Sequence, residues 1–203
     1  MSLREVKAER TRAAILHAAL DLFAAQGFDL TTMEQIAAAS QIGIATLYRY
    51  FPTKDGILLE PVVATQGLLA SKLDARPNDE PLAEALGHAL RDYLAEFDRD
   101  AENWLRLRDL LDHAPGPRAR LWDVWAQDRS ALERAIAARS SQAPDDLSVG
   151  IAAHTTMMVA QMALDLVRSA HPPVRAADAA RDIIGLLGND GALIPRLPED
   201  RSS

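Results

Sequence analysis

Cysteine is missing from this chain of 203 residues. Without thiols the protein can form no disulfide bond, no thiolate metal site and no cysteine nucleophile, which excludes disulfide scaffolds and cysteine-dependent enzymes. Aromatic residues make up only 5% of the chain, and it lacks runs of alternating polar and apolar side chains, which are typical of strands. The 10 glycines seldom stand in hairpin dipeptides. These shortages favour an all-helical protein.

Long apolar runs are also scarce. The charge-free stretch 149–164 contains polar residues and is shorter than the roughly 20 apolar residues that a membrane-spanning helix requires. The first residues are strongly charged, with no apolar stretch of the length found in a signal peptide behind them. We therefore expect a soluble cytoplasmic protein with no membrane partner. The net charge of -7 argues against indiscriminate binding of nucleic acid, so any DNA contact requires a local basic patch.

Apolar residues recur at helical spacing along the chain, and capping residues, glycines and prolines separate the helices. The first predicted helix, 3–26, ends at a glycine. Residues 31–34, Thr-Thr-Met-Glu, match a capping box in which the glutamate reaches back to the start of a second, short helix. A third helix covers 44–50, and Thr53 caps a fourth that runs towards Leu73. Further helices are predicted near 82–98, 101–113, 118–139, 146–169 and 174–188, and a loose tail over 191–203.

Two short helices joined by a four-residue turn lie within residues 31–50. This layout is typical of a helix-turn-helix, in which the second helix enters the major groove of DNA. Here that second helix carries hydroxyls, an arginine and two tyrosines on faces that cannot all be buried. The segment is therefore a candidate DNA-binding motif.

The residues that surround this motif form a recognisable set: Arg10-Thr-Arg12, Leu22-Phe23, Gly27-Phe28, Thr31-Thr32, Ile36-Ala37 and Thr46 to Asp55. In this set the first sixty residues resemble the TetR-type transcriptional repressors. The resemblance implies a three-helix helix-turn-helix domain over 1–60 and a helical-bundle domain for ligand binding and dimerisation over 61–190. It also implies a homodimeric repressor that a small molecule releases from operator DNA. The chain departs from the family pattern at Gln41, Gly43 and Ala45, where Gly, Ser and Gly are usual.

Candidate DNA contacts follow from the residue types and from the resemblance. Arginine can bind guanine through two hydrogen bonds, and small apolar groups can meet the thymine methyl group. The resemblance assigns Tyr48 to a phosphate, Lys54 is a further phosphate candidate, and the N–H groups that begin the helix after Thr31 and Thr32 can also receive a phosphate oxygen. The full predicted set is Thr31, Thr32, Gln41, Ile44, Ala45, Thr46, Tyr48, Arg49, Tyr50 and Lys54.

The remaining residues exceed what a lone DNA-binding module needs. The stretch 149–164 is apolar nearly all round, so it has to bury two sides, of which one could lie in a dimer interface. The predicted interface residues are Ile151, Met162, Val174, Ile183, Ile184 and Leu187. The predicted wall of a pocket for a small, lipophilic ligand is Trp104, Leu107, Leu111, Trp122, Trp125, Met157 and Met158, and plain core packing is the alternative for these residues.

Two other functions stay open, a helical metal-dependent enzyme and a DNA-binding protein without a ligand. A di-metal bundle needs a Glu-x-x-His motif on each of two helices, and the sequence contains no such set. We therefore expect no enzyme activity, no metal and no cofactor. Pro61 falls inside the predicted fourth helix, where proline removes a backbone hydrogen bond. We expect a kink between Ile57 and Pro61, which acts either as a pivot for the DNA-binding domain or as a static bend.

Overall fold

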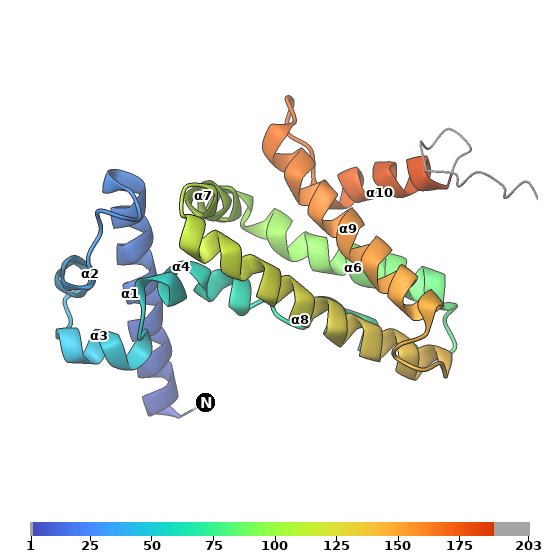
Figure 1. Ribbon diagram of the computed structural model, residues 1–203, viewed down its shortest axis with the longest axis horizontal. Coiled ribbons are helices and arrows are strands. Elements are labelled where there is room, and N and C mark those ends of the chain that lie inside the picture. The colour runs from blue at the N-terminus through green and yellow to red at the C-terminus, as the bar shows by residue number, and fades with distance from the viewer. Residues whose placement is uncertain (1, 189–203) are drawn as a thin grey trace, which may run out of the picture.

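The computed structural model describes residues 2–188, and every regular element in that part of the chain is an α-helix (Figure 1). The prediction of an all-helical protein is confirmed. The predicted tail, 191–203, lies outside the described residues, as do residues 189–190 of the predicted second domain. The helices are α1 (Leu3–Gln26), α2 (Met33–Ala39), α3 (Ile44–Tyr50), α4 (Lys54–Val63), α5 (Leu68–Asp74), α6 (Leu82–Arg99), α7 (Ala101–Asp112), α8 (Pro115–Ser140), α9 (Leu147–Ser169) and α10 (Ala176–Leu187).

Helices α1 to α3 form a small N-terminal unit, which we call the head; it stands at one end of the molecule in Figure 1. Helix α2 begins with a capping box, but not the predicted one. The Thr32 hydroxyl accepts the Gln35 amide N–H, and the Gln35 side chain accepts the Thr32 N–H. Because Thr32 is the N-cap, position N3 belongs to Gln35 and not to Glu34.

Helix α4 joins the head to the rest of the chain, and the prediction that it runs on to Leu73 is wrong. It ends at Val63, two residues after Pro61, whose missing N–H leaves the helical ladder one donor short. Residues 64–67, which we call the joint, form turns, and α5 begins only at Leu68. Gly67 closes the joint with a φ of 71°, a left-handed conformation that side-chain-bearing residues rarely adopt.

Helices α5 to α10 form the body, and buried apolar residues divide into two cores. The body core joins α5, α6, the second half of α8, α9 and α10, with Leu73, Leu94, Leu132 and Val149 fully buried. The head core joins α1 to α4 with α7 and the start of α8, because Leu107, Leu110, Leu111 and Leu121 pack in the same cluster as Ile15 and Phe23. The head therefore shares its core with two helices of the body.

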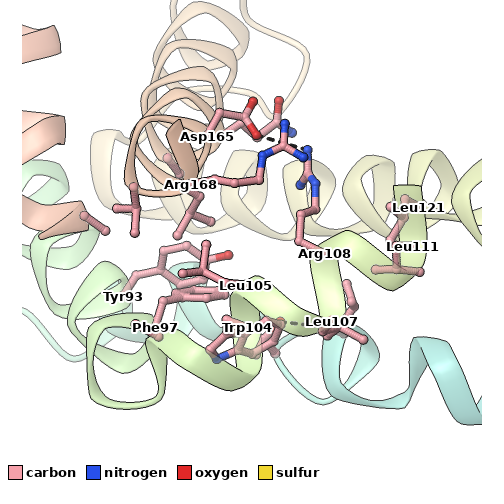
Figure 2. A pocket seen from close by; sticks show the side chains of 18 of the residues that line it. Tyr93, Phe97, Trp104, Leu105, Leu107, Arg108, Leu111, Leu121, Asp165 and Arg168 are labelled. Carbon is pink, nitrogen blue, oxygen red and sulfur yellow. Dashed lines mark hydrogen bonds and ion pairs between the residues drawn. The ribbon is translucent and has the colours of Figure 1, made fainter. Parts of the chain in front are cut away.

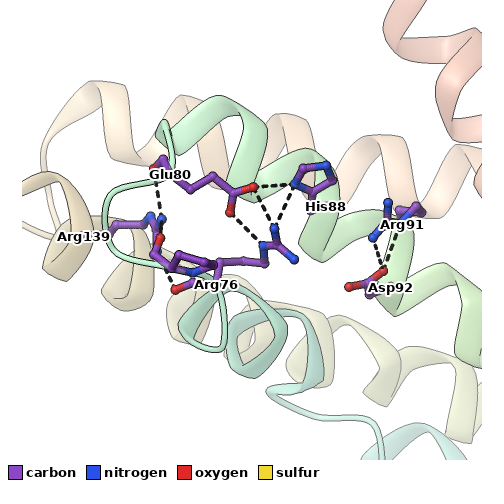
Figure 3. Close-up of polar contacts among 7 residues, drawn as sticks. Arg76, Glu80, His88, Arg91, Asp92 and Arg139 are labelled. Atoms are coloured by element: carbon purple, nitrogen blue, oxygen red, sulfur yellow. Dashed lines mark hydrogen bonds and ion pairs between the residues drawn. The ribbon is translucent and has the colours of Figure 1, made fainter.

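The loop between α5 and α6 is held by a polar cluster (Figure 3). Arg76 binds Glu80 through two hydrogen bonds of 2.7 and 2.8 Å, and the His88 ring nitrogen Nδ1 lies 2.5 Å from the same carboxylate. Arg139 of α8 donates to the carbonyls of Arg76, Pro77 and Glu80. The hydrogen bond from Arg76 is the first cause that lowers the pKa of Glu80 to about 2. This cluster ties the loop to α6 and α8.

Helix α9 is long and apolar enough to cross a membrane by length and composition alone, which the shorter stretch 149–164 did not suggest. The core helix of a globular protein passes the same test. One side of α9 contributes Val149, Ala153, Val159 and Ala163 to the body core. Its other side is exposed and is described below.

Candidate DNA interface and ligand pocket

The turn between α2 and α3 is built from a buried corner. Ile36 and Ala37 of α2 and Leu47 of α3 are buried in the head core. Gln41 takes a φ of 56° in the turn, which an L residue other than asparagine or aspartate seldom adopts. The Ile42 N–H then donates to the Ala37 carbonyl at 3.0 Å. The corner fixes how α3 stands against α2, and so which side chains α3 exposes.

Helix α3 turns one face to solvent. Ile44 and Tyr48 are four residues apart, as are Ala45 and Arg49, so the four side chains share one side of the helix. All four are exposed, Tyr48 to 46%, and Gln41 is exposed beside them in the turn. The structure thus brings together five of the residues predicted to contact DNA. We call them the α3 face.

Three other predicted contacts lie at the margin of this face. Thr46 and Tyr50 are half-buried, and Tyr50 packs against the head core. The Arg49 guanidinium lies 5.6 Å from the centre of the Tyr50 ring, within the range of a cation–π contact. Thr32 is exposed at the start of α2. The Tyr50 ring is therefore a cation–π partner of the Arg49 side chain.

Thr31 does not fit its predicted role, because its side chain is buried, with 1% exposed. Its hydroxyl donates to the Gly27 carbonyl at 2.8 Å and accepts from the Gln26 side chain at 3.2 Å. These bonds close the turn between α1 and α2. Adjacent threonines cannot be told apart by sequence, and here only Thr32 faces solvent.

Lys54 is also placed differently from the prediction. Its ammonium group donates to the carbonyls of Phe28, Asp29 and Thr31 at 2.6, 3.3 and 2.9 Å, and it lies 4.3 Å from the centre of the Phe28 ring. An ammonium group has three N–H donors, and all three are used. Lys54 ties α4 to the turn that precedes α2, so a phosphate would have to displace a carbonyl.

The start of α1 offers other basic side chains. Arg4, Lys7 and Arg10 are exposed. Arg12 donates to the Glu60 carboxylate of α4 at 2.7 Å and lies over the Phe51 ring. Arg12 therefore connects α1 to α4, whereas Arg4, Lys7 and Arg10 have their charges in solvent.

A cavity in the body is lined from α4, the joint, α6, α7, α8, α9 and the start of α10, and we call it the pocket. The empty space within it is about 1020 Å³, including the part that opens to solvent. Of the predicted wall residues, the pocket is lined by Trp104, Leu107, Leu111, Trp125 and Met157. Figure 2 shows Tyr93, Phe97 and Trp104 on one side of it and Arg108, Arg168 and Asp165 on the other.

Two predicted wall residues lie elsewhere. Trp122 is 70% exposed on α8, where it meets Trp125 edge-on at 5.4 Å, and Met158 is exposed on the outer side of α9. Neither lines the pocket. Sequence reasoning also missed Tyr93 and Phe97 of α6. Their spacing of four residues beside the buried Leu90 and Leu94 was the available signal, since it places both rings at the edge of the buried face.

The charged groups at the pocket fall into two sets. At the exposed side, Arg108 donates to Asp165 at 3.2 Å, and Arg168 pairs with Asp112. Further in, the carboxylate of Asp128 accepts the Gly67 N–H at 2.7 Å. Burial raises the pKa of Asp128 above its ordinary value, against the lowering effect of that hydrogen bond. Burial likewise raises the pKa of Tyr93, and the charge of Asp128 adds to the effect.

One ion pair and the head core connect the body to the head, and a second ion pair connects the body to α4. Arg106 of α7 donates to Asp21 of α1 at 2.7 Å, and Arg120 of α8 lies 3.7 Å from Asp55 of α4. The side chains of Leu107, Leu111 and Leu121 line the pocket and also belong to the head core. One layer of leucines therefore separates the pocket from the helices of the head.

The outer side of α9 and the neighbouring end of α10 expose apolar side chains. Among the predicted interface residues, Ile151, Met162, Val174 and Ile184 are exposed. Ile183 is buried in the body core and Leu187 packs against that core, so these two do not fit the prediction. We call the exposed set the apolar face: Leu147, Ile151, Met158, Met162, Leu166 and Ile184.

Two family descriptions match the chain. Bacterial regulatory proteins of the tetR family match residues 15–60, and the MftR C-terminal domain matches residues 80–187. The chain belongs to the tetR family of bacterial regulatory proteins. This confirms the family that the first sixty residues resemble. Its members are transcription regulators, which makes the helix-turn-helix a DNA-binding element of the family.

Individual relatives agree with the family. The HTH-type transcriptional regulator TcmR of Streptomyces glaucescens is 33% identical over 151 residues, which cover 71% of this chain and 66% of TcmR. The match thus spans slightly less than two thirds of that relative. Two solved structures share the fold. FadR of Thermus thermophilus in complex with lauroyl-CoA is 21% identical with a TM-score of 0.54, and the match covers 92% of this chain and 97% of FadR. A SmeT–triclosan complex is 20% identical with a TM-score of 0.62, and the match covers 94% of this chain and 100% of SmeT.

Proposed function

We propose that this member of the tetR family is a cytoplasmic, homodimeric repressor that binds operator DNA through the α3 face and leaves it when an apolar small molecule fills the pocket. The observation that carries the proposal is the layer formed by Leu107, Leu111 and Leu121. These side chains touch the pocket on one side and the head on the other. A ligand that moves α7 or α8 therefore moves the helices that carry α3.

The α3 face supplies the base-reading part of the proposal. Arg49 is positioned by Tyr50 to bind guanine, Ile44 and Ala45 can meet thymine methyl groups, and Gln41 can bind adenine. Arg4, Lys7 and Arg10 supply phosphate contacts from α1. Because Lys54 and Arg12 are engaged inside the protein, each copy brings few free cations, so binding should depend on salt only moderately.

A second copy of the chain is the proposed occupant of the apolar face. Soluble proteins seldom leave large apolar patches in water, and this face follows nearly the whole length of α9. A short helix-turn-helix also reads too few base pairs alone, and a two-fold dimer places two α3 helices on half-sites about one helical turn, or a multiple of it, apart.

The pocket supports an apolar ligand because its walls are leucine, methionine and aromatic side chains. Of the two solved structures named above, one holds lauroyl-CoA, which has a long apolar acyl chain, and the other holds triclosan.

Selection of bound duplexes from random DNA by the purified full-length chain tests the DNA part. We expect a palindrome with two half-sites, and binding without sequence preference would contradict the proposal. Light scattering tests the dimer. Met162→Glu should give monomers, whereas Leu30→Glu, which changes an even more exposed apolar residue on the head, should leave the dimer intact.

A further inference from the structure

The Asp128 carboxylate lines the pocket without a cationic partner. Among residues 2–188 no lysine, arginine or histidine lies within 4 Å of it, and the Gly67 N–H is its hydrogen-bond donor. The other carboxylates of the pocket differ. Asp165 faces Arg108, and Asp98 accepts the Ala176 N–H at the start of α10, where the helix dipole offsets its charge. Asp128 is thus the pocket acid whose charge is least compensated.

A second polar group stands beside it unused. The Tyr93 ring is partly buried against the body core, and it lies close enough to Asp128 for the charge of that carboxylate to raise the pKa of Tyr93. Tyr93 lines the pocket (Figure 2). Among the residues that the structure describes, none forms a hydrogen bond with its hydroxyl group. The hydroxyl is therefore free to donate to or accept from a polar group of a ligand in the pocket.

Three aromatic residues of the pocket come from α6 and α7. Tyr93, Phe97 and Trp104 form a continuous set, with ring centres 4.9 and 4.6 Å apart. Aromatic faces attract cations, and they do so more strongly where water is excluded. Arg108 is paired with Asp165 and Arg168 with Asp112, which Arg118 also approaches. Asp128 is therefore the pocket group that most favours a positive ligand group.

Asp128 also holds the joint. Its bond to the Gly67 N–H fixes the residue at which α5 begins after the break, and Val62 and Thr65 on the other side of the break line the pocket. A group that draws the Asp128 carboxylate towards the pocket therefore acts on the joint between α4 and the body.

Resting on the proposed function, we propose that the pocket takes an apolar amine, whose protonated nitrogen binds Asp128 and the Tyr93 hydroxyl and loosens the Gly67–Asp128 hydrogen bond that holds the joint. The joint, and not Pro61 itself, is the pivot of the head. Amine binding then changes the tilt of α4 and with it the spacing of the two α3 helices in the dimer.

Three probes with one chain length and different head charges test the ligand class: dodecylamine, dodecan-1-ol and dodecanoate, each below its micelle-forming concentration at pH 7.5. Tryptophan fluorescence reports binding, since Trp104 and Trp125 line the pocket. A charge-assisted hydrogen bond predicts that the amine binds roughly tenfold to a hundredfold more tightly than the alcohol. Equal affinities for the three probes, or tighter binding of dodecanoate, would overturn the proposal.

Two variants separate the charge from the joint. Asp128→Asn keeps an oxygen for the Gly67 N–H but removes the charge, so we expect it to fold and to lose the preference for the amine. Asp165→Asn is the matched control, because it removes a pocket carboxylate that Arg108 already neutralises; it should keep the preference. An amine preference that survives in Asp128→Asn would overturn the assignment of Asp128. If that variant fails to fold, the amine-to-alcohol ratio of the unchanged protein still decides.

Hydrogen exchange of the Gly67 amide tests the effect on the joint. Dodecylamine should accelerate the exchange several-fold, and Asp128→Ala should do so without any probe. Unchanged exchange with the amine bound would overturn the coupling. DNA release is measured separately on the selected duplex. Tight, Asp128-dependent amine binding without release would contradict the proposed function, whereas release by an uncharged probe alone would contradict the amine.

Discussion

The α3 face and the pocket are assembled in different ways. The four side chains of α3 in the α3 face come from six consecutive residues, 44–49, and one turn of helix aligns them. The pocket takes its wall from residues as far apart as Val62 and Ala176, carried on five helices and the start of a sixth. Local spacing therefore determines the first site, and the packing of distant helices determines the second.

The two sites are nevertheless joined at Leu107, Leu111 and Leu121, which face both. In the proposed mechanism the side chains of the α3 face contact the DNA bases, while ligand binding in the pocket changes the position of α3.

The largest effect is expected where the two sites meet. Leu107→Ala removes a buried side chain from the layer between them and should lower the free energy of unfolding by about 2–5 kcal/mol. Urea unfolding of the purified chain measures this loss. Operator affinity and probe binding should both weaken, and loss of only one of them would show that the layer does not join the sites.

Arg49→Ala should affect the α3 face alone. If Arg49 binds guanine, the change lowers operator affinity by about 1–3 kcal/mol and relaxes the preference at one position. Binding to the selected duplex and to single-position variants of it gives this number. Dodecylamine binding should not change. An unchanged ratio of operator to random-DNA affinity would show that Arg49 reads no base.

Lys54→Met should act on stability and not on the ionic part of DNA binding. Removing the ammonium group leaves the carbonyls of Phe28, Asp29 and Thr31 without their donor, which should lower stability by about 1–2 kcal/mol. The slope of log affinity against log salt should stay the same, while Arg10→Met should make it shallower by about one unit. A shallower slope in Lys54→Met would restore Lys54 to the DNA contacts.

The lowered pKa of Glu80 predicts that the stability of the body, and not of the head, depends on pH. Its pKa is lowered to about 2, first by the hydrogen bond from Arg76. Because the pKa in the folded state is below the ordinary value, Glu80 stabilises the fold above pH 4.5, and this contribution is lost as the pH falls towards 2. Thermal unfolding between pH 5 and pH 2.5 should show a smaller decrease in Glu80→Gln than in the unchanged protein.

The smallest effect distinguishes two neighbouring tryptophans of α8. Trp125 lines the pocket and Trp122 does not. Trp125→Leu should weaken dodecylamine binding about threefold to tenfold, and Trp122→Leu should leave it unchanged. Tryptophan fluorescence, read from the remaining residues, measures both. Equal weakening would place Trp122 at the ligand.

Sequence reasoning succeeded where one helix settles the matter. The bounds of α1, the position of α2 and α3, and the exposure of Tyr48 and Arg49 follow from periodicity and caps. It was wrong where a neighbour from elsewhere in the chain decides. The Lys54 ammonium group is bound by carbonyls of residues 28, 29 and 31, which the sequence around residue 54 does not reveal. The helix after Thr53 was extended past Pro61 because a proline inside a helix can either kink it or end it.

The sequence by itself determined the helical class and the helix-turn-helix layout, since these depend on spacings that a single helix or turn expresses, and its first sixty residues carry the resemblance to the tetR family. Only the tertiary structure decided which of two threonines is buried, which of two tryptophans meets the pocket, and which side of α9 is left apolar in water. An amphipathic pattern shows that a residue belongs on a face, but the partner that covers that face is chosen by helices far away in the chain.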